Sequence, residues 1–344
     1  MTFLHNTEIV PLSHIFIMFI LTFAVAMILT PLYTDLAYRY KWWRRPRENA
    51  VTGEAAPVYQ SLHAGKHKRN IPTMAGIIMI VAVALVTVVL NLDRNQTWLP
   101  LAMLVIFGAL GLVDDISNLF FSDKRGGLSV KTQLLALIGL AIIGASWFYF
   151  KLGYNLIHVP AVGDFSIGWL YIPLFVLVVV SCAKSISITD GLDGLAGGLL
   201  SVVFGAYGVI AYFQGSYGIA GFCAALVGAI MAFTWFNIFP ARFFMGQTGS
   251  TALGATLGAV AMLTNAVFVL PIIGAVFVIE AGSSLIQITS KKVFKRKIFL
   301  SAPLHHHLEA IGWPETKVTM RLWVVGQIAA AIGLVLGLLG NHLR

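Results

Sequence analysis

Ten long apolar windows constrain this chain more than any other feature of its sequence. A transmembrane helix needs roughly 20 apolar residues to cross about 30 Å of hydrocarbon. Windows of about this length cover residues 14–36, 72–92, 97–113, 132–150, 168–188, 196–213, 217–239, 252–266, 268–290 and 321–341. Only the turn around Thr264 and Asn265 separates the eighth window from the ninth. We therefore predict an all-α, polytopic integral membrane protein with about ten transmembrane helices.

The composition agrees with this class and excludes an ordinary soluble domain. Hydrophobic residues make up 58% of the chain, charged residues 11%, and the mean hydropathy is +0.85. Soluble domains carry about 25% charged residues. No repeat or linker separates the windows, so we predict a single membrane-embedded domain over residues 1–344. Cys182 and Cys223 both fall inside windows and lack metal-binding spacing, which predicts buried thiols.

The net charge of +9 is explained by topology. Cytoplasmic loops of membrane proteins are enriched in Lys and Arg. With ten spans, all but three of the 23 Lys and Arg residues fall on one side, and the exceptions are Arg94, Lys151 and Arg344. This asymmetry predicts that both termini lie outside the cytoplasm. A nucleic-acid partner is not required.

The first polar motif ends the third window, where Asp114 follows Val113 and precedes Asp115. Charges at such depth in a membrane protein are costly and usually mark a function. An adjacent carboxylate pair can bind Mg²⁺, or one member can act as a general base. A solvated helix end that happens to carry two acids is the alternative interpretation.

The second motif, Thr-Asp-Gly-Leu-Asp-Gly-Leu-Ala-Gly-Gly at 189–198, lies between two apolar windows. The spacing of Asp190 and Asp193 suits a tight turn that opens a helix, with both carboxylates on one face. The glycines allow a ligand to approach the backbone, and helix N-termini favour phosphate. Asp and Gly are also the ordinary residues of turns, so a structural loop is the alternative.

The third motif, at 236–250, contains Phe-Phe-Met-Gly-Gln-Thr-Gly-Ser. Its Gly-Gln-Thr-Gly-Ser part is of the kind that exposes backbone N–H groups to an anion. Phe243 or Phe244 is a candidate for stacking on a nucleobase. Aromatic residues at this depth are more often interfacial anchors, so this motif alone is a weak indication.

The fourth motif is the run His305, His306 and His307. Three consecutive histidines cannot all point one way, so a zinc site formed by this run alone is excluded; contact with a pyrophosphate is the functional interpretation. Glu280 lies inside the ninth window with Ser283, Ser284 and Gln287 on the same helical face. Structural hydrogen bonding and substrate contact both remain open for Glu280, and Gly274 and Gly282 are candidate points of bending.

Taken in order, the four motifs resemble those of the phospho-N-acetylmuramoyl-pentapeptide transferases. These enzymes are a branch of the polyprenyl-phosphate N-acetylhexosamine 1-phosphate transferases. Pro-Thr-Met-Ala-Gly at 72–76 resembles the family's Pro-Thr-Met-Gly-Gly, and Gly-Trp-Pro-Glu at 312–315 follows the histidines as in the family. The resemblance extends from about residue 66 to the C terminus. The histidine run and the Pro-Thr-Met segment favour this branch over relatives that use N-acetylglucosamine.

The resemblance implies a bacterial inner-membrane enzyme with a cytoplasmic active-site cleft, Mg²⁺ dependence and a homodimer. It implies transfer of phospho-N-acetylmuramoyl-pentapeptide from a UDP-sugar donor to undecaprenyl phosphate, giving lipid I and UMP. Attack of one phosphate anion on another requires charge neutralisation, which a metal ion and cationic side chains supply.

The resemblance also assigns roles to individual residues. The implied catalytic set is Asp114 (base, or orienting the acceptor phosphate), Asp115, Asp190, Asp193, His305, His306 and His307. Asp190 and Asp193 would line the metal and nucleotide region, with Gln247 at a third metal-ligand position. Phe244 would stack on uracil. The other implied substrate-binding residues are Lys68, Thr73, Lys131, Asn237 and Gln287.

The chain departs from the family pattern at several positions. Gln247 stands where the family has the Asp that binds the metal, and Lys184 and Ser187 stand where it has two Asn residues. A family lysine after the Asp pair is Asn118 here. A neutral amide is a poorer ligand for a hard cation than a carboxylate. We therefore predict that the fold and nucleotide binding persist while Mg²⁺-dependent turnover is weak. As a separate hypothesis, Lys184 compensates by supplying positive charge that binds phosphate.

Two other functional classes remain at this point. A sibling transferase would use UDP-N-acetylglucosamine or another UDP-sugar. A catalytically silent protein would bind nucleotide sugars or polyprenyl lipids without turnover, an option that Gln247 favours and that the complete set of four Asp residues opposes.

Overall fold

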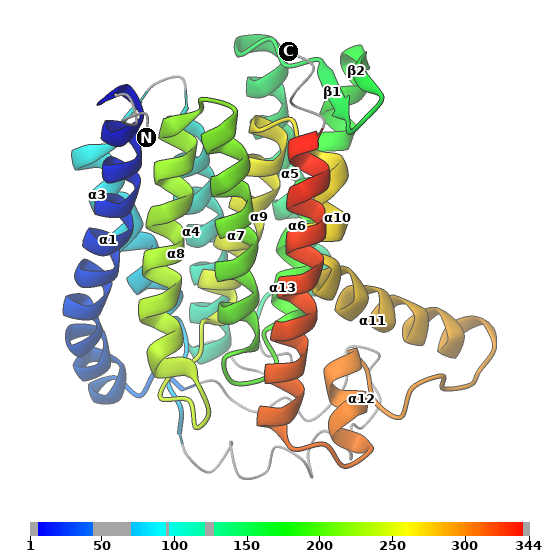
Figure 1. Ribbon diagram of the computed structural model, residues 1–344. Coiled ribbons are helices and arrows are strands. Elements are labelled where there is room, and N and C mark those ends of the chain that lie inside the picture. The colour runs from blue at the N-terminus through cyan, green and yellow to red at the C-terminus, as the bar shows by residue number, and fades with distance from the viewer. Residues whose placement is uncertain (1–5, 44–69, 94–95, 121–126, 340–344) are drawn as a thin grey trace.

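The computed structural model of this protein describes residues 6–43, 70–93, 96–120 and 127–339. Within these ranges the chain is mostly helical (Figure 1). The helices are α1 (Asn6–Arg39), α3 (Gly76–Leu90), α4 (Trp98–Phe120), α5 (Val130–Ser146), α6 (Tyr171–Thr189), α7 (Leu195–Phe213), α8 (Tyr217–Asn237), α9 (Gly246–Leu263), α10 (Leu270–Ile273), α11 (Ala275–Val293), α12 (Leu304–Ala310) and α13 (Glu315–Leu339). Figure 1 shows α1, α8, α7 and α13 side by side along one face of the bundle.

A helix occupies most of each of the ten predicted windows. Among the described residues, seven helices are long and apolar enough to cross a membrane, or eight if the bent pair formed by 267–273 and 275–293 is one span. The helix α3 is apolar but shorter, with 15 residues. The polytopic membrane class is therefore supported, while the count of ten spans stays a prediction.

Helix α9 is the central helix of the bundle, and it packs against α3, α4 and α6. Every residue of α9 except Gln247 is buried. Small residues make this possible: a Cβ atom added to Gly254 would lie 2.5 Å from the Cα of Ala183 in α6. Membrane helices approach closely through such small residues. The Gly, Ser and Thr residues also lower the hydropathy of α9, which explains why it is absent from the seven apolar helices.

The ninth window does not form one straight helix. The short segment that ends with α10 meets α11 at an angle of 79°, and Gly274 stands at the break. Of the two candidate bending points, Gly274 is confirmed, whereas Gly282 lies inside the uninterrupted helix α11 and marks no break. Figure 1 shows α11 leaving the bundle sideways, with α12 below it.

A small β-hairpin qualifies the all-α prediction. Strand β1 (Leu156–Val159) pairs antiparallel with β2 (Gly163–Ser166) in the connection between α5 and α6. The connecting turn contains Ala161 with φ of 64°, and Gly163, the first residue of β2, has φ of 127°. The hairpin is short and lies outside the apolar windows, so it leaves the helical architecture unchanged.

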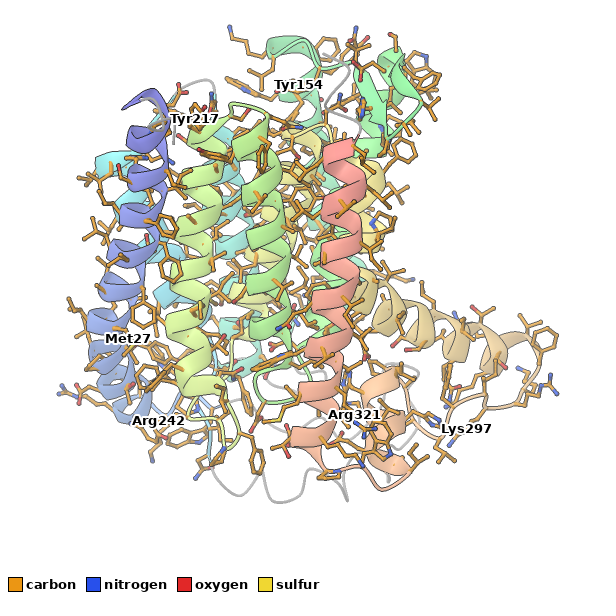
Figure 2. The ribbon with its side chains drawn as sticks, in the orientation of Figure 1. Met27, Tyr154, Tyr217, Arg242, Lys297 and Arg321 are labelled. Carbon is orange, nitrogen blue, oxygen red and sulfur yellow. The ribbon has the colours of Figure 1, made fainter. Side chains whose placement is uncertain are left out.

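The two ends of the bundle differ in charge. Figure 1 places the start of α1, the end of α13 and the hairpin at one end, and α12 at the other. Arg242, Arg321 and Lys297 lie at or near the α12 end in Figure 2, whereas Tyr154 and Tyr217 lie at the opposite end. This arrangement matches the charge asymmetry expected from the sequence.

Candidate functional site

The polar side chains of four helices meet at the α12 end of the bundle. Asp114 lies near the end of α4 and is 4% exposed. Its Oδ1 accepts a hydrogen bond from the backbone N–H of Leu128 at 2.8 Å, and its Oδ2 accepts one from Nε2 of Gln133 at 3.3 Å. Both carboxylate oxygens of Asp114 are thus held in place, one by Leu128 just before α5 and the other by Gln133 in the first turn of α5.

Asp115 is directed to a different partner, the first turn of α9. Its Oδ2 accepts hydrogen bonds from the backbone N–H of Thr248 at 2.9 Å and from the Thr248 hydroxyl at 2.8 Å. The sequence predicts that Gly-Gln-Thr-Gly-Ser presents backbone N–H groups to an anion. In the structure this segment begins a helix, and one anion that it binds is the carboxylate of Asp115.

Helix α6 contributes Lys184 and Ser187, one turn apart on the same side. The ammonium group of Lys184 donates a hydrogen bond to Oε1 of Gln133, the residue that also binds Asp114. The hydroxyl group of Ser187 bonds the amide of Gln247, with 2.8 Å to Nε2 and 3.0 Å to Oε1. The helices α4, α5, α6 and α9 are therefore joined through one set of polar contacts.

The turn after α6 separates its two acids. Asp190 is the C-cap of α6 and is partly exposed, whereas Asp193 is 2% exposed. The Oδ2 atom of Asp193 accepts a hydrogen bond from the backbone N–H of Ala241 at 2.9 Å, and its own N–H donates to Glu315 at 2.7 Å. Asp193 thereby ties the turn to the loop before α9 and to the start of α13.

The loop between α8 and α9 holds the candidate aromatic residues. Phe243 is 1% exposed and packs in a cluster with Tyr33, Phe233 and Phe236. Phe244 is partly exposed. Of the two aromatic residues that the sequence proposes for stacking, Phe244 is the one whose ring is accessible.

Two further predicted substrate-binding residues are hydrogen-bonded to backbone. Asn237 is buried; its Oδ1 accepts from the N–H of Gly194 at 3.0 Å, and its Nδ2 donates to the carbonyl of Phe243 at 2.9 Å. Thr73 is also buried, and its carbonyl accepts a hydrogen bond from the Tyr33 hydroxyl. These contacts place Thr73 and Asn237 beside the loop that precedes α9.

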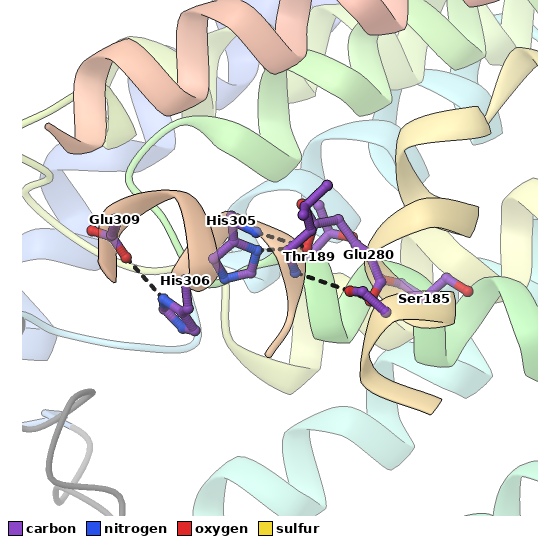
Figure 3. Close-up of polar contacts among 8 residues, drawn as sticks. Ser185, Thr189, Glu280, His305, His306 and Glu309 are labelled. Carbon is purple, nitrogen blue, oxygen red and sulfur yellow. Dashed lines mark hydrogen bonds and ion pairs between the residues drawn. The ribbon is translucent and has the colours of Figure 1, made fainter. Parts of the chain in front are cut away.

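The three histidines have three different hydrogen-bond partners, and Figure 3 shows His305 and His306 directed to theirs. His305 meets Glu280 with 2.8 Å between Nδ1 and Oε2, and His306 meets Glu309 with 2.8 Å between Nδ1 and Oε2. His307 accepts a bond from the backbone N–H of Leu300 at 3.3 Å. The run therefore joins α12 to α11 through His305 and to the preceding segment through His307, while His306 bonds within α12.

The contact between His305 and Glu280 is fully buried, with both side chains 0% exposed. A carboxylate only accepts, so this contact places the proton of a neutral imidazole on Nδ1 and leaves Nε2 as an acceptor. Among the described residues Nε2 has no hydrogen-bond partner, and a Cβ atom added to Gly191 would lie 2.4 Å from it. His305 is thus held against the turn that carries Asp190. Glu280 acts here as a structural partner.

The polar stripe on α11 faces the interior, except for Ser284, which is partly exposed. Ser283 and Gln287 are buried together with Glu280. The Oε1 atom of Gln287 accepts hydrogen bonds from the N–H groups of Ile298 and Phe299, both at 3.0 Å, and its Nε2 donates to the carbonyl of Phe299 at 2.9 Å. Gln287 therefore anchors the segment that leads to α12.

Two cationic candidates are placed differently. Lys131 is exposed at the first turn of α5. Lys68 lies outside the described residues.

Sequence reasoning did not identify Gln133, Thr248 or Glu315, which bind Asp114, Asp115 and Asp193 respectively. One signal for Gln133 and Thr248 was available in the sequence. Each is a polar residue in the first turn or so of a helix, at the predicted inner end of a span.

The described residues do not form a complete protein cage for a divalent metal ion, and several of the predicted ligands are bonded to other groups. Within the described residues, no group of three or more His, Cys, Asp or Glu side chains is placed to hold a metal. One oxygen of Asp115 is bonded to Thr248, Asp193 is bonded to Ala241, and the amide of Gln247 is bonded to Ser187. Mg²⁺ requires near-octahedral coordination by oxygens and usually one or two carboxylates.

Comparisons with known proteins identify close relatives. A model of the family described as Glycosyl transferase family 4 matches residues 97–265. A phospho-N-acetylmuramoyl-pentapeptide-transferase of Chloroflexus aurantiacus is 39% identical over 314 residues, or 87% of this chain and 85% of that protein. The protein of the same name from Geobacillus kaustophilus is 36% identical over 333 residues, or 94% and 98%. That from Levilactobacillus brevis is 36% identical over 299 residues, or 85% and 91%.

Proposed function

The chain belongs to the phospho-N-acetylmuramoyl-pentapeptide transferase family, and from this premise we propose that the α12 end of the bundle carries the transfer reaction. The function is phosphoglycosyl transfer in peptidoglycan synthesis. The observation that carries the assignment of the site is the set of contacts through which α4, α5, α6 and α9 bring Asp114, Gln133, Lys184 and Gln247 together.

The substrates follow from the family. A nucleotide sugar is the donor and a polyprenyl phosphate is the acceptor. More specifically, we propose UDP-N-acetylmuramoyl-pentapeptide as the donor and undecaprenyl phosphate as the acceptor. An oxygen of the acceptor phosphate forms a bond to the sugar-bearing phosphorus of the donor. The bond from that phosphorus to the bridging oxygen breaks, UMP leaves with the electron pair, and lipid I forms.

Asp114 is the residue that we propose to orient the acceptor phosphate or to accept its proton. Its carboxylate is buried and positioned by Leu128 and Gln133, which restricts its rotation. Pre-positioned groups contribute to catalysis because they do not reorganise during the reaction. Asp190 and the Nε2 atom of His305 lie along the neighbouring turn, where we propose that the donor binds.

The predicted Mg²⁺ cofactor stays a prediction. Gln247 is a neutral amide, and one carboxylate oxygen of Asp115 and one of Asp193 already accept hydrogen bonds. These contacts argue for a weak metal site, so no step of the reaction is assigned to a metal. Phe244 keeps its predicted role, because its ring is partly exposed while Phe243 is enclosed. We further propose a cytoplasmic orientation of the site in a bacterial inner membrane and assembly as a homodimer.

One experiment separates this function from its alternatives. Purified full-length protein is offered UDP-N-acetylmuramoyl-pentapeptide or UDP-N-acetylglucosamine with undecaprenyl phosphate, in Mg²⁺ and in EDTA, and lipid products are identified by mass. We expect lipid I from the first donor and none from the second. A product only from UDP-N-acetylglucosamine would assign the chain to the sibling transferases. Binding of UDP without any lipid product would support the silent alternative.

A further inference from the structure

A fixed positive charge lies within the polar contacts of the proposed site. Lys184 is partly buried near the end of α6, and its ammonium group donates to Oε1 of Gln133. Gln133 in turn donates from Nε2 to Oδ2 of Asp114. The amide of Gln133 therefore joins the ammonium group of Lys184 to the carboxylate of Asp114 and holds the cation in the same cluster.

The neighbouring position that the family uses for a metal ligand is filled by a neutral pair. Gln247 and Ser187 bond each other through both atoms of the amide, and Thr251 adds a contact of 3.4 Å to Oε1 of Gln247. Ser187 lies three residues after Lys184 in α6, so the two side chains leave the same side of the helix. The neutral pair and the cation are thus adjacent parts of one arrangement.

The charges of this arrangement balance without a metal. A divalent cation bound by one carboxylate has a net charge of +1, and so does one ammonium group beside a neutral amide. An ammonium group one helical turn from the position of a divalent cation would also repel that cation, and this repulsion is weakly screened in a partly buried site. A lysine ammonium is a compact point charge that binds phosphate well.

From these contacts we propose that Lys184 is the phosphate-binding cation of this site and replaces a divalent metal ion. The ligand is a phosphate group, either in the pyrophosphate of the nucleotide sugar or in the phosphate of the prenyl acceptor. This inference rests on the proposed function for the identity of these ligands. It goes beyond that function because it assigns the cation of the reaction centre to the chain itself and makes phosphate binding independent of metal.

The first test measures metal binding directly. Full-length protein in detergent is titrated with Mn²⁺, and free Mn²⁺ is followed by electron paramagnetic resonance. We expect no stoichiometric binding below millimolar Mn²⁺. The triple variant Lys184→Asn, Ser187→Asn and Gln247→Asp restores the ligand types of the family and is expected to bind one Mn²⁺ at least tenfold more tightly. Equal, tight binding of Mn²⁺ by the unmodified protein would overturn the proposal.

The second test measures phosphate binding by calorimetry, with UDP for the donor and farnesyl phosphate for the acceptor. We expect the dissociation constants of the unmodified protein in EDTA and in Mg²⁺ to agree within about twofold. Lys184→Met is expected to weaken binding of at least one ligand tenfold or more, since a charge-assisted hydrogen bond is lost, and Lys184→Arg should retain most of the affinity. The ligand that is weakened identifies which phosphate Lys184 contacts.

The matched control is Lys151→Met, which removes the same charge at the opposite end of the bundle and should leave both dissociation constants unchanged. Size-exclusion profiles and thermal midpoints establish that each variant is folded. An unchanged affinity of Lys184→Met for both ligands would overturn the inference about Lys184. Failure of the unmodified, folded protein to bind UDP in either buffer would instead contradict the proposed function, while the Mn²⁺ titration would still test the metal-free site.

Discussion

At the scale of single residues, the buried polar side chains of this protein divide into those that hold backbone and those that remain able to act on a ligand. Asn237 and Gln287 bind backbone groups through both atoms of their amides. Asp193 binds the loop before α9. By contrast, the Nε2 atom of His305 has no hydrogen-bond partner among the described residues and faces Gly191. The chemistry is therefore expected to depend more on His305 than on Gln287.

The buried pair of Glu280 and His305 gives the first prediction at this scale. Glu280→Ala leaves the buried Nδ1–H of the imidazole without its acceptor, which costs about 1–3 kcal/mol, and it also opens a cavity. Glu309→Ala removes the partner of His306 on the same short helix, where both side chains are 7–8% exposed. We expect thermal unfolding in detergent to show a clearly larger drop in midpoint for Glu280→Ala. Equal drops would show that burial of the first pair adds nothing.

Gly191 gives the second prediction. A methyl group at this position would displace the imidazole of His305, because the added Cβ lies 2.4 Å from Nε2. We expect Gly191→Ala to reduce lipid-product formation by about tenfold or more. Gly205→Ala in α7, where an added Cβ meets nothing within 4 Å, is the control and should retain full activity.

A double-mutant cycle tests whether this loss acts through the histidine. If Gly191→Ala acts by moving His305, then adding His305→Ala to it should cause little further loss, since interacting residues are not additive. Independent, multiplying losses in the double variant would show that Gly191 acts on the substrate directly.

At the scale of elements, the apolar windows predicted where helices occur but not how each one is used. Helix α9 begins at Gly246, six residues before the predicted window 252–266. The reason is that Gly-Gln-Thr-Gly-Ser forms the first turn of this helix instead of a loop. The hydrogen bonds from Thr248 to Asp115 stabilise this turn, and they join residues 133 positions apart in the chain. Such a long-range contact leaves no local signal in the sequence, whereas the break at Gly274 was visible as a glycine inside an apolar run.

The packing of α9 against α6 gives the prediction at this scale. Gly254→Ala would place a methyl group 2.5 Å from the Cα of Ala183, and overpacking of a core costs about 1–3 kcal/mol. Gly205→Ala lacks such a contact and gains helix propensity of about 0.5–1 kcal/mol. Thermal midpoints should therefore shift in opposite directions for the two variants. A midpoint for Gly254→Ala at or above that of the unmodified protein would mean that α9 and α6 separate easily.

At the scale of the whole molecule, the resemblance located the four motifs, and the structure shows how the helices connect them. Asp114, Lys184 and Gln247 come from three different helices. Gln133 of a fourth helix bonds both Asp114 and Lys184, and Gln247 bonds Ser187, one turn from Lys184. The sequence predicted that such helix ends meet at one side of the membrane. It did not identify Gln133, because a glutamine in the first turns of an apolar helix is also typical of an interfacial residue.

The orientation of the bundle in the membrane provides the last prediction. The positive-inside rule places the end with Arg242, Lys297 and Arg321 in the cytoplasm, and the hairpin end outside (Figure 2). Single cysteines are introduced by Lys151→Cys or Lys295→Cys, in a background where Cys182 and Cys223 are replaced by Ala. Both sites lie at helix ends, outside the apolar helix interiors. An impermeant maleimide added to intact cells, with the outer membrane permeabilised, should label Lys151→Cys only.

Labelling of Lys295→Cys should appear only after the inner membrane is opened, because the α12 end then becomes accessible to the reagent. The same measurement decides where the substrates must arrive. A nucleotide sugar made in the cytoplasm cannot cross the hydrocarbon layer, so the reaction requires the cluster of Asp114 and Lys184 to face the compartment that holds the donor. Labelling of Lys295→Cys in cells with an intact inner membrane would reverse the topology and would separate the polar cluster from its proposed donor.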